Sequence, residues 1–246
     1  MAQSAVSTTV HEVSEAIISV AARKKLLHFS LTPAAKQRAK AAFSRRGCIP
    51  GVLACVDGTL VAIEKPQGLS LGDTESCMTR KGYYALNVMV LASQLELGDY
   101  VLGYPRLDSG RPRKCGSFVQ EIPLTGKATA QFMWPVAPHE APVECDSGYL
   151  LETWLLTPIP GNLAPGTPES ECNKEHTSMR NVVGRCIGVL KSRFRCLQRY
   201  RALLYKPDRA AGIVSACAAL HNITVEAGEP VFAEDSNGGA MPPAPV

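Results

Sequence analysis

The chain has 246 residues, of which 46% are hydrophobic and 20% are charged, a composition typical of a globular protein with a sizeable core. A net charge of +4 is too small to indicate a nucleic-acid partner by itself.

No run approaches the roughly 18 consecutive apolar residues of a membrane span, and the N-terminus lacks the charged-then-apolar order of a signal peptide. We therefore expect an intracellular protein without a membrane partner. Nine cysteines, an odd number with no CxxC pair, indicate neither a zinc site nor a disulfide framework, so we expect reduced, mostly buried thiols.

Two helices are predicted at the start of the chain. In residues 3–25 an apolar stripe follows the three- and four-residue spacing of one helix face: Val6, Val10, Val13, Ile17 and Val20. Residues 32–46, "TPAAKQRAKAAFSRR", predict a second helix.

The pattern then changes to that of strands. Residues 51–58 and 59–66 predict two short strands joined at Asp57-Gly58, a dipeptide that favours a tight hairpin turn. Residues 83–93, "YYALNVMVLAS", predict a third strand, and residues 98–105 predict a fourth.

The second half is mixed. Prolines and glycines recur from residue 105 to residue 142, which predicts mostly loop with a short helix at most. Residues 142–158 predict a buried strand that ends at Asp146, followed by a turn and an apolar segment. Residues 209–226 predict the last helix, and the polar, Pro/Gly-rich residues 229–246 predict a disordered tail.

One predicted helix, residues 180–196, contains two glycines, Gly184 and Gly188. Its apolar residues nevertheless repeat at helical spacing: Val183, Ile187, Leu190, Phe194 and Leu197. Each interior glycine costs about 1 kcal/mol relative to alanine. A glycine kept there indicates either close backbone packing or a side chain that has been lost.

Two aspartates, Asp57 and Asp146, stand where predicted strands stop. Strand ends are where open α/β sheets place their chemistry, and two carboxylates there could share a pair of divalent cations. Taken separately, each aspartate is also explained as an ordinary turn or helix-cap residue.

A basic stretch, "KSRFRCLQRYR", follows the two glycines. Its cations are Lys191, Arg193, Arg195, Arg199 and Arg201. Such a cluster could contact DNA phosphates, but taken alone it is better explained as the solvated C-terminal end of a helix.

Taken together, five segments resemble the PIF/Harbinger transposases and the nucleases derived from them: "CVDGTLVAIEKP", "RKGYYALNVMV", "DSGYLLETWLLTPIP", "TPESECNKEHTSMRNVVGRCIGVLKSRFRCL" and "ACAALHNI". They occur in family order over about residues 3 to 228. The resemblance implies an α/β fold with an RNase H-like mixed sheet flanked by helices. It also implies a DDE triad that binds two divalent metal ions, magnesium or manganese, and cuts DNA.

Carried over by residue, the first two triad positions fall on Asp57 and Asp146, which the resemblance makes catalytic and metal-binding residues. The glutamate of the family's "VVER" motif falls on Gly184, at the family spacing of 184 − 146 = 38 residues. Catalysis is therefore expected to be impaired. Glu175 lies nine residues before Gly184, half a helical turn out of phase, so we expect it to face the wrong way to replace the ligand. Gly188 matches a family glycine, for which we expect close packing.

Arg185 is expected to contact DNA because it directly follows the missing ligand. Four further cations are also expected DNA contacts: Lys191, Arg193, Arg195 and Arg199. Two histidines receive other interpretations. His221 is expected to be a packing residue in the last helix, and His176 to lie near a helix start, where a DNA contact is an alternative.

The chain also departs from the family pattern. "YPRLDSGRP" replaces a longer family segment and leaves Asp108 only approximately in place. We expect residues 1–48 to be a helical remnant of an N-terminal helix-turn-helix region, residues 49–228 the DDE domain, and residues 229–246 the tail.

Three hypotheses follow from these observations. The first is a nuclease-like protein that binds metal and DNA by descent, the DNA binding being weak and non-specific. The second is a non-catalytic interaction protein that works with a Myb/SANT-like partner, and the third is a decayed transposon remnant. The resemblance implies a nuclear protein, with the cytoplasm as a second location.

Overall fold

The computed structural model describes most of the chain outside a central segment. The described residues are 3–27, 32–47, 49–68, 74–75, 77–94, 98–103, 120–124, 128–132, 143–144 and 155–229. The prediction of a disordered tail lies outside these residues, apart from residue 229.

A five-stranded mixed sheet forms the centre of the fold, in the order β3-β2-β1-β6-β7. Its strands are β1 (Ala54–Ala62), β2 (Ala85–Gln94), β3 (Gly98–Gly103), β6 (Val143–Glu144) and β7 (Leu155–Leu156). The first strand is central. On one side β2 and β3 follow as antiparallel neighbours, and on the other side β6 and β7 run parallel to β1.

The predicted hairpin turn at Asp57-Gly58 is wrong, because β1 runs through both residues as one strand. Asp57 pairs with Val90 and Gly58 with Met89 in an unbroken antiparallel register that extends from Cys55 to Ala62. An Asp-Gly pair favours a turn locally, but the continuous pairing of β1 with β2 stabilises extended backbone at both residues. Asp57 therefore lies inside a central strand. The strands predicted at residues 83–93 and 98–105 are confirmed as β2 and β3.

Residues 105–142 contain a strand pair where mostly loop was expected. The strands β4 (Gln120–Leu124) and β5 (Ala128–Phe132) form a separate two-stranded antiparallel sheet. Pro123 within β4 weakens the strand signal in the sequence, because proline is rare within strands. The described part of this segment contains no helix.

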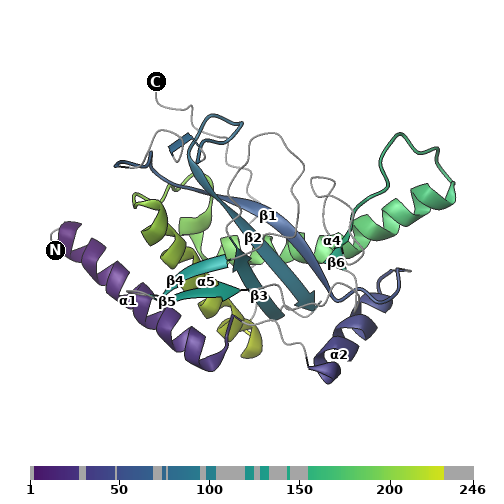
Figure 1. The fold of residues 1–246 in the computed structure, drawn as a ribbon, viewed down its shortest axis with the longest axis horizontal. Helices are drawn as coiled ribbons and strands as arrows, with labels where there is room; N and C mark the ends of the chain where they lie inside the picture. The colour runs from purple at the N-terminus through teal and green to yellow at the C-terminus, as the bar shows by residue number, and fades with distance from the viewer. Residues whose placement is uncertain are drawn as a thin grey trace.

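The predicted helices are confirmed, with shifted ends. They are α1 (Gln3–Lys24), α2 (Pro33–Ser44), α4 (Pro168–Arg193) and α5 (Pro207–Glu226). The helix predicted to start at residue 180 begins at Pro168 and ends before Phe194, after which a short 3-10 turn, η2, spans Arg195–Leu197. Figure 1 shows the long α4 crossing the sheet, with α2 at one end.

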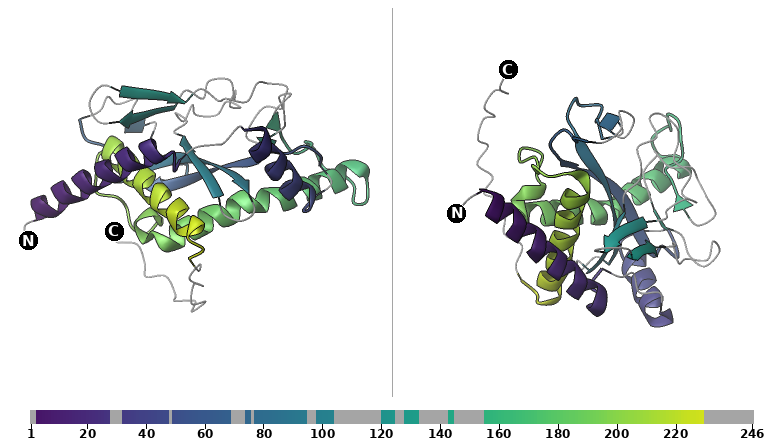
Figure 2. Two further views of the ribbon diagram at one scale, coloured as in Figure 1. Left: turned by 90° about the horizontal axis from the view of Figure 1, so that it is seen from below. Right: turned by 60° about the vertical axis from the view of Figure 1, so that its left-hand side comes forward.

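The N-terminal helix packs on the rest of the fold. α1 runs beside α5 (Figure 2). Ile18 of α1 lies 3.7 Å from the position that a Cβ would take at Gly212, and Asn222 Nδ2 donates a hydrogen bond of 2.7 Å to the Leu26 carbonyl. Within the described residues, no helix has the length and apolar character that crossing a membrane requires.

The main core lies between the sheet and the two C-terminal helices. α4 contributes a buried face: Met179, Val182, Val183, Cys186 and Leu190. α5 and the first two strands supply most of the rest. Cysteines in the described ranges are thiols, and Cys55, Cys186 and Cys217 are buried.

Candidate metal and DNA site

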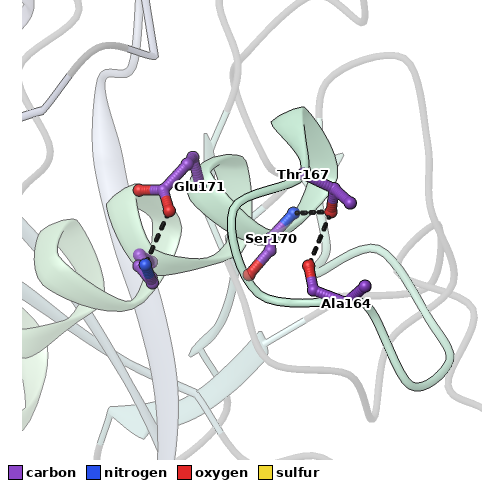
Figure 3. A network of polar contacts seen from close by, with 5 residues as sticks. Ala164, Thr167, Ser170 and Glu171 are labelled. Carbon is purple, nitrogen blue, oxygen red and sulfur yellow. Dashed lines mark hydrogen bonds and ion pairs between the residues drawn. The ribbon is translucent and has the colours of Figure 1, made fainter.

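The site depends on α4, whose start is defined by a capping residue. Thr167 Oγ1 accepts a hydrogen bond of 3.2 Å from the Ser170 amide and donates one of 3.0 Å to the Ala164 carbonyl (Figure 3). Pro168 occupies the first helical turn, where a backbone N–H would have no hydrogen-bond partner within the helix. Glu171 lies near the positive end of the helix dipole and pairs with Lys174 at 2.6 Å. The sequence therefore starts this helix about four turns before Gly184.

The first half of α4 is tied to the parallel edge of the sheet. His176 is 3% exposed, and its Nε2 donates a hydrogen bond of 3.2 Å to the carbonyl of Leu156 in β7. The side chain of Asn173 bonds both the amide and the carbonyl of Ile159, at 2.8 and 2.9 Å. His176 is thus a buried packing residue inside the helix. Its burial argues against a contact between His176 and DNA, the alternative that the sequence left open.

The middle and second half of α4 lie along β1. The Cys55 thiol donates to the Met179 carbonyl at 3.4 Å. Arg180 Nη2 lies 3.1 Å from Asp57 Oδ2, and the two side chains are each 25% exposed. Further along the strand, Lys191 Nζ donates a hydrogen bond of 2.8 Å to the carbonyl of Leu60. Burial lowers the pKa of Lys191.

Gly184 shares the edge of α4 that carries these two cations. At about 100° per residue, position 184 lies about 40° around the helix from Arg180 and about 20° from Lys191. Because those two side chains contact β1 at Asp57 and Leu60, Gly184 lies on the helix edge next to that part of the strand. It is exposed, and a Cβ added there would meet no described atom within 4 Å. A longer side chain at this position therefore has room on the edge of α4 that contacts β1.

Both carboxylate oxygens of Asp57 accept a hydrogen bond. Oδ1 accepts one of 2.8 Å from the amide of Gly58, and Oδ2 accepts the one from Arg180. The carboxylate is therefore paired with a cation within the fold. Arg180 is a site residue that the sequence reasoning missed, because only acidic side chains were considered around the expected metal site. The spacing of Arg180, one helical turn before Gly184, is the signal in the sequence that could have identified it.

Asp146 and Asp108 lie outside the described residues, so the expected approach of Asp146 to Asp57 stays a prediction. The strand before Asp146 is described. Glu144 of β6 pairs with Cys55 of β1 in parallel register. In sequence, each aspartate follows its paired residue by two positions.

Among the described residues, the side chains do not form a metal centre of the kind that the sequence resemblance implies. They contain no group of three or more His, Cys, Asp or Glu residues that could hold a metal ion. The expected third ligand position carries no side chain at all, and Glu175 lies beside Gly47. Asp57, at the position expected for the first triad ligand, is paired with Arg180. The described donors by themselves therefore do not fit two divalent cations.

The comparisons with known proteins identify the family. The family described as DDE superfamily endonuclease matches residues 56–222, a stretch that contains Asp57, Arg180 and Gly184. The chain belongs to the DDE superfamily endonucleases. Endonucleases of this superfamily generally depend on divalent metal ions.

Curated relatives confirm the resemblance to Harbinger-derived nucleases. The chain is 31% identical over 240 residues to "Putative nuclease HARBI1" of Rattus norvegicus and 31% identical over 244 residues to the Homo sapiens protein of that name, and each match covers 97% of this chain. The chain spans 64% of the length of each of these relatives. "Protein ALP1-like" of Arabidopsis thaliana is 34% identical over 83 residues, 33% of this chain and 20% of the relative. No solved structure matches the chain.

The five cations predicted to contact DNA differ in their surroundings in this DDE family member. Lys191 bonds to Leu60, and Arg193 bonds to the Thr224 hydroxyl and, at 2.8 Å, to the Glu229 carbonyl. These two side chains therefore hold elements of the fold together. The other three are exposed: Arg185, Arg195 and Arg199. Arg199 lies 5.0 Å from the ring centre of Tyr83, a cation–π contact.

The expectation that Gly188 is kept for close packing is wrong. Gly188 is exposed, and a Cβ added to it would meet no described atom within 4 Å. The buried face of α4 lies on the other side of the helix, so nothing in the described fold requires a glycine at this position.

Gly188→Ala should therefore stabilise the protein. Alanine removes the cost of an interior helix glycine, so the free energy of unfolding should rise by up to about 1 kcal/mol. Urea denaturation followed by circular dichroism measures this change. A clear loss of stability would show that the glycine is needed for packing after all.

Proposed function

We propose that this chain is a Harbinger transposase-derived nuclease-like protein that associates with DNA and whose metal centre is incomplete. One observation carries the proposal: Gly184, at the position of the third acidic ligand, lies on the edge of α4 that contacts β1 at Asp57. The helix therefore presents the position to the site, while the side chain that would complete the site is missing. Catalysis is impaired for that reason.

We also propose that the sheet belongs to the RNase H-like class. In support, β1 is central, β2 and β3 are its antiparallel neighbours on one side, and β6 and β7 are parallel to it on the other. The register of β1 with β6 supports a second proposal, that Asp146 joins Asp57 at the site, because carboxyl groups at matching positions of neighbouring parallel strands lie side by side.

Calorimetric titration with Mg²⁺ or Mn²⁺ tests the proposed centre. The wild-type protein should bind metal weakly, because two carboxylates supply few oxygens to a hard cation. Asp57→Asn should abolish the residual binding. Tight binding by the wild type that survives Asp57→Asn would rule out this location of the site.

DNA binding should depend on the exposed cations rather than on the whole basic stretch. We expect weak, non-specific binding that falls steeply with salt, and Arg195→Ala with Arg199→Ala should reduce the salt slope by about 0.9 for each phosphate that is no longer neutralised. A filter-binding series at several salt concentrations measures the slope. Arg23→Ala, an exposed cation on α1, is the matched control and should leave the slope unchanged. Tight binding to one sequence with little salt dependence would contradict this account.

A non-catalytic interaction protein is a second candidate, and exposed apolar side chains on α1 favour it. Val6 is 45% exposed and Val13 is 51% exposed on one stripe of the helix, a surface that a partner could cover. We propose a Myb/SANT-like DNA-binding protein as that partner and the nucleus as the location. If the folded protein binds no metal but is captured by such a partner, and Val6→Ser with Val13→Ser abolishes capture, this candidate replaces the first.

A further inference from the structure

We propose that Arg180 is a built-in counter-ion for Asp57. Its guanidinium group occupies the side of the Asp57 carboxylate that a metal ion would need. This inference rests on the proposed function, because it concerns the same site. It goes further in naming a second cause of the weak metal binding, independent of the missing carboxylate at Gly184. Arg180 is a positioning and charge-neutralising residue, and the metal ion competes with it.

The geometry supports this assignment. Arg180 Nη2 and Asp57 Oδ2 lie 3.1 Å apart, and the side chains are each only a quarter exposed, so solvent weakens the attraction less than it does on an open surface. The second carboxylate oxygen is satisfied by the Gly58 amide. A cation that approached Asp57 would therefore have to break an existing charge-assisted hydrogen bond as well as lose its own water.

The position of the guanidinium is fixed by the fold. The carbonyl of Met179, the residue before Arg180, accepts the hydrogen bond from Cys55, two residues before Asp57 on the strand. This contact between the Cys55 thiol and the helix backbone places Arg180 opposite Asp57. His176, one turn earlier, is buried and bonded to Leu156, so this end of α4 is anchored to the sheet.

The charge at the site differs accordingly from that of a carboxylate cluster. The edge of α4 that contacts β1 brings cations to Asp57 and its neighbours: Arg180 pairs with Asp57, Gly184 has no side chain, and Lys191 lies further along the same edge. A carboxylate restored at position 184 would stand one helical turn from Arg180, at the spacing of a helix salt bridge. Arg180 would then compete with the metal for two carboxylates instead of one.

The test compares Mn²⁺ affinity in four proteins by isothermal titration calorimetry: wild type, Arg180→Met, Gly184→Glu and the double variant. Methionine keeps much of the length of the side chain and removes its charge, and Arg180→Lys is the matched control that keeps the charge. We expect the double variant to bind Mn²⁺ at least tenfold tighter than Gly184→Glu, a difference of about 1.4 kcal/mol. Arg180→Lys in the Gly184→Glu background should give little of this gain.

A second measurement does not involve metal. In a double-mutant cycle of Asp57→Asn and Arg180→Met, unfolded by urea in the presence of a chelator, the two changes should be non-additive, because each removes the same ion pair. Additive effects would overturn the counter-ion assignment even if no variant bound Mn²⁺.

The outcomes separate this inference from the proposed function. If Gly184→Glu tightens Mn²⁺ binding and Arg180→Met adds nothing to it, the centre is correctly located and the counter-ion proposal is wrong. If Gly184→Glu tightens Mn²⁺ binding with neither arginine nor methionine at position 180, the lost-ligand proposal fails, while the metal-free cycle still decides whether Arg180 neutralises Asp57.

Discussion

Gly184→Glu should make the melting temperature of the protein respond to Mn²⁺ or Mg²⁺ where the wild type responds little. The added carboxylate stands on the edge of α4 that contacts β1, with no described atom outside its own stretch of helix within 4 Å of its Cβ to obstruct it. Metal ions that bind only the folded state stabilise it. At ten times the Kd, the gain is about 1.4 kcal/mol, or about 3 to 6 °C for a chain of this size.

Gly184→Gln is the matched control for this experiment. Glutamine has nearly the same shape and restores a non-glycine residue to the helix, so both variants gain up to about 1 kcal/mol in helix propensity. The charge alone distinguishes them in the response to metal. Equal shifts for glutamate and glutamine would show that position 184 is not a lost ligand. Recovery of DNA nicking is a separate question, because the "YPRLDSGRP" segment also departs from the family pattern that the resemblance implies.

The second large effect should be a loss of stability in acid that depends on His221. This histidine is 0% exposed in α5, and burial, with a smaller contribution from the nearby Arg193 guanidinium, lowers its pKa from 6.5 to about 4. Above pH 6.5 the ring is neutral in both the folded and the unfolded chain, so its contribution is fully present. Between pH 6.5 and about 4 the unfolded chain binds a proton that the folded chain does not, so stability falls as the pH falls. The total loss is about 3 kcal/mol.

Urea denaturation at a series of pH values measures this effect as a slope. His221→Gln should flatten the dependence between pH 6.5 and pH 4, whatever it does to stability at neutral pH, because the variant has lost the titrating group. His176 has a pKa lowered mainly by burial as well, so His176→Gln should remove part of the remaining slope. A slope unchanged by His221→Gln would show that the buried ring is not the group responsible.

Much of the local structure of this protein follows from the sequence alone. The 3.6-residue spacing of apolar side chains predicts α1, α2 and α5, and the same spacing in α4 identifies Val183 and Leu190 as buried residues. Helical phase also places Gly184 and Glu175 on different sides of α4. These conclusions hold because helix periodicity is a local property, set by neighbours three and four residues away.

The tertiary structure decided what local pattern could not. Asp57-Gly58 favours a turn, yet pairing with β2 keeps both residues in the extended backbone of β1. The partner of Asp57 is Arg180, 123 residues away in the chain, and the packing of α4 on β1 brings the two together. Nor does the spacing of cations show that Lys191 bonds to Leu60 while Arg195 is exposed. A side chain's hydrogen-bond partners depend on which distant backbone is packed against it, and that is determined only when sheet and helix assemble.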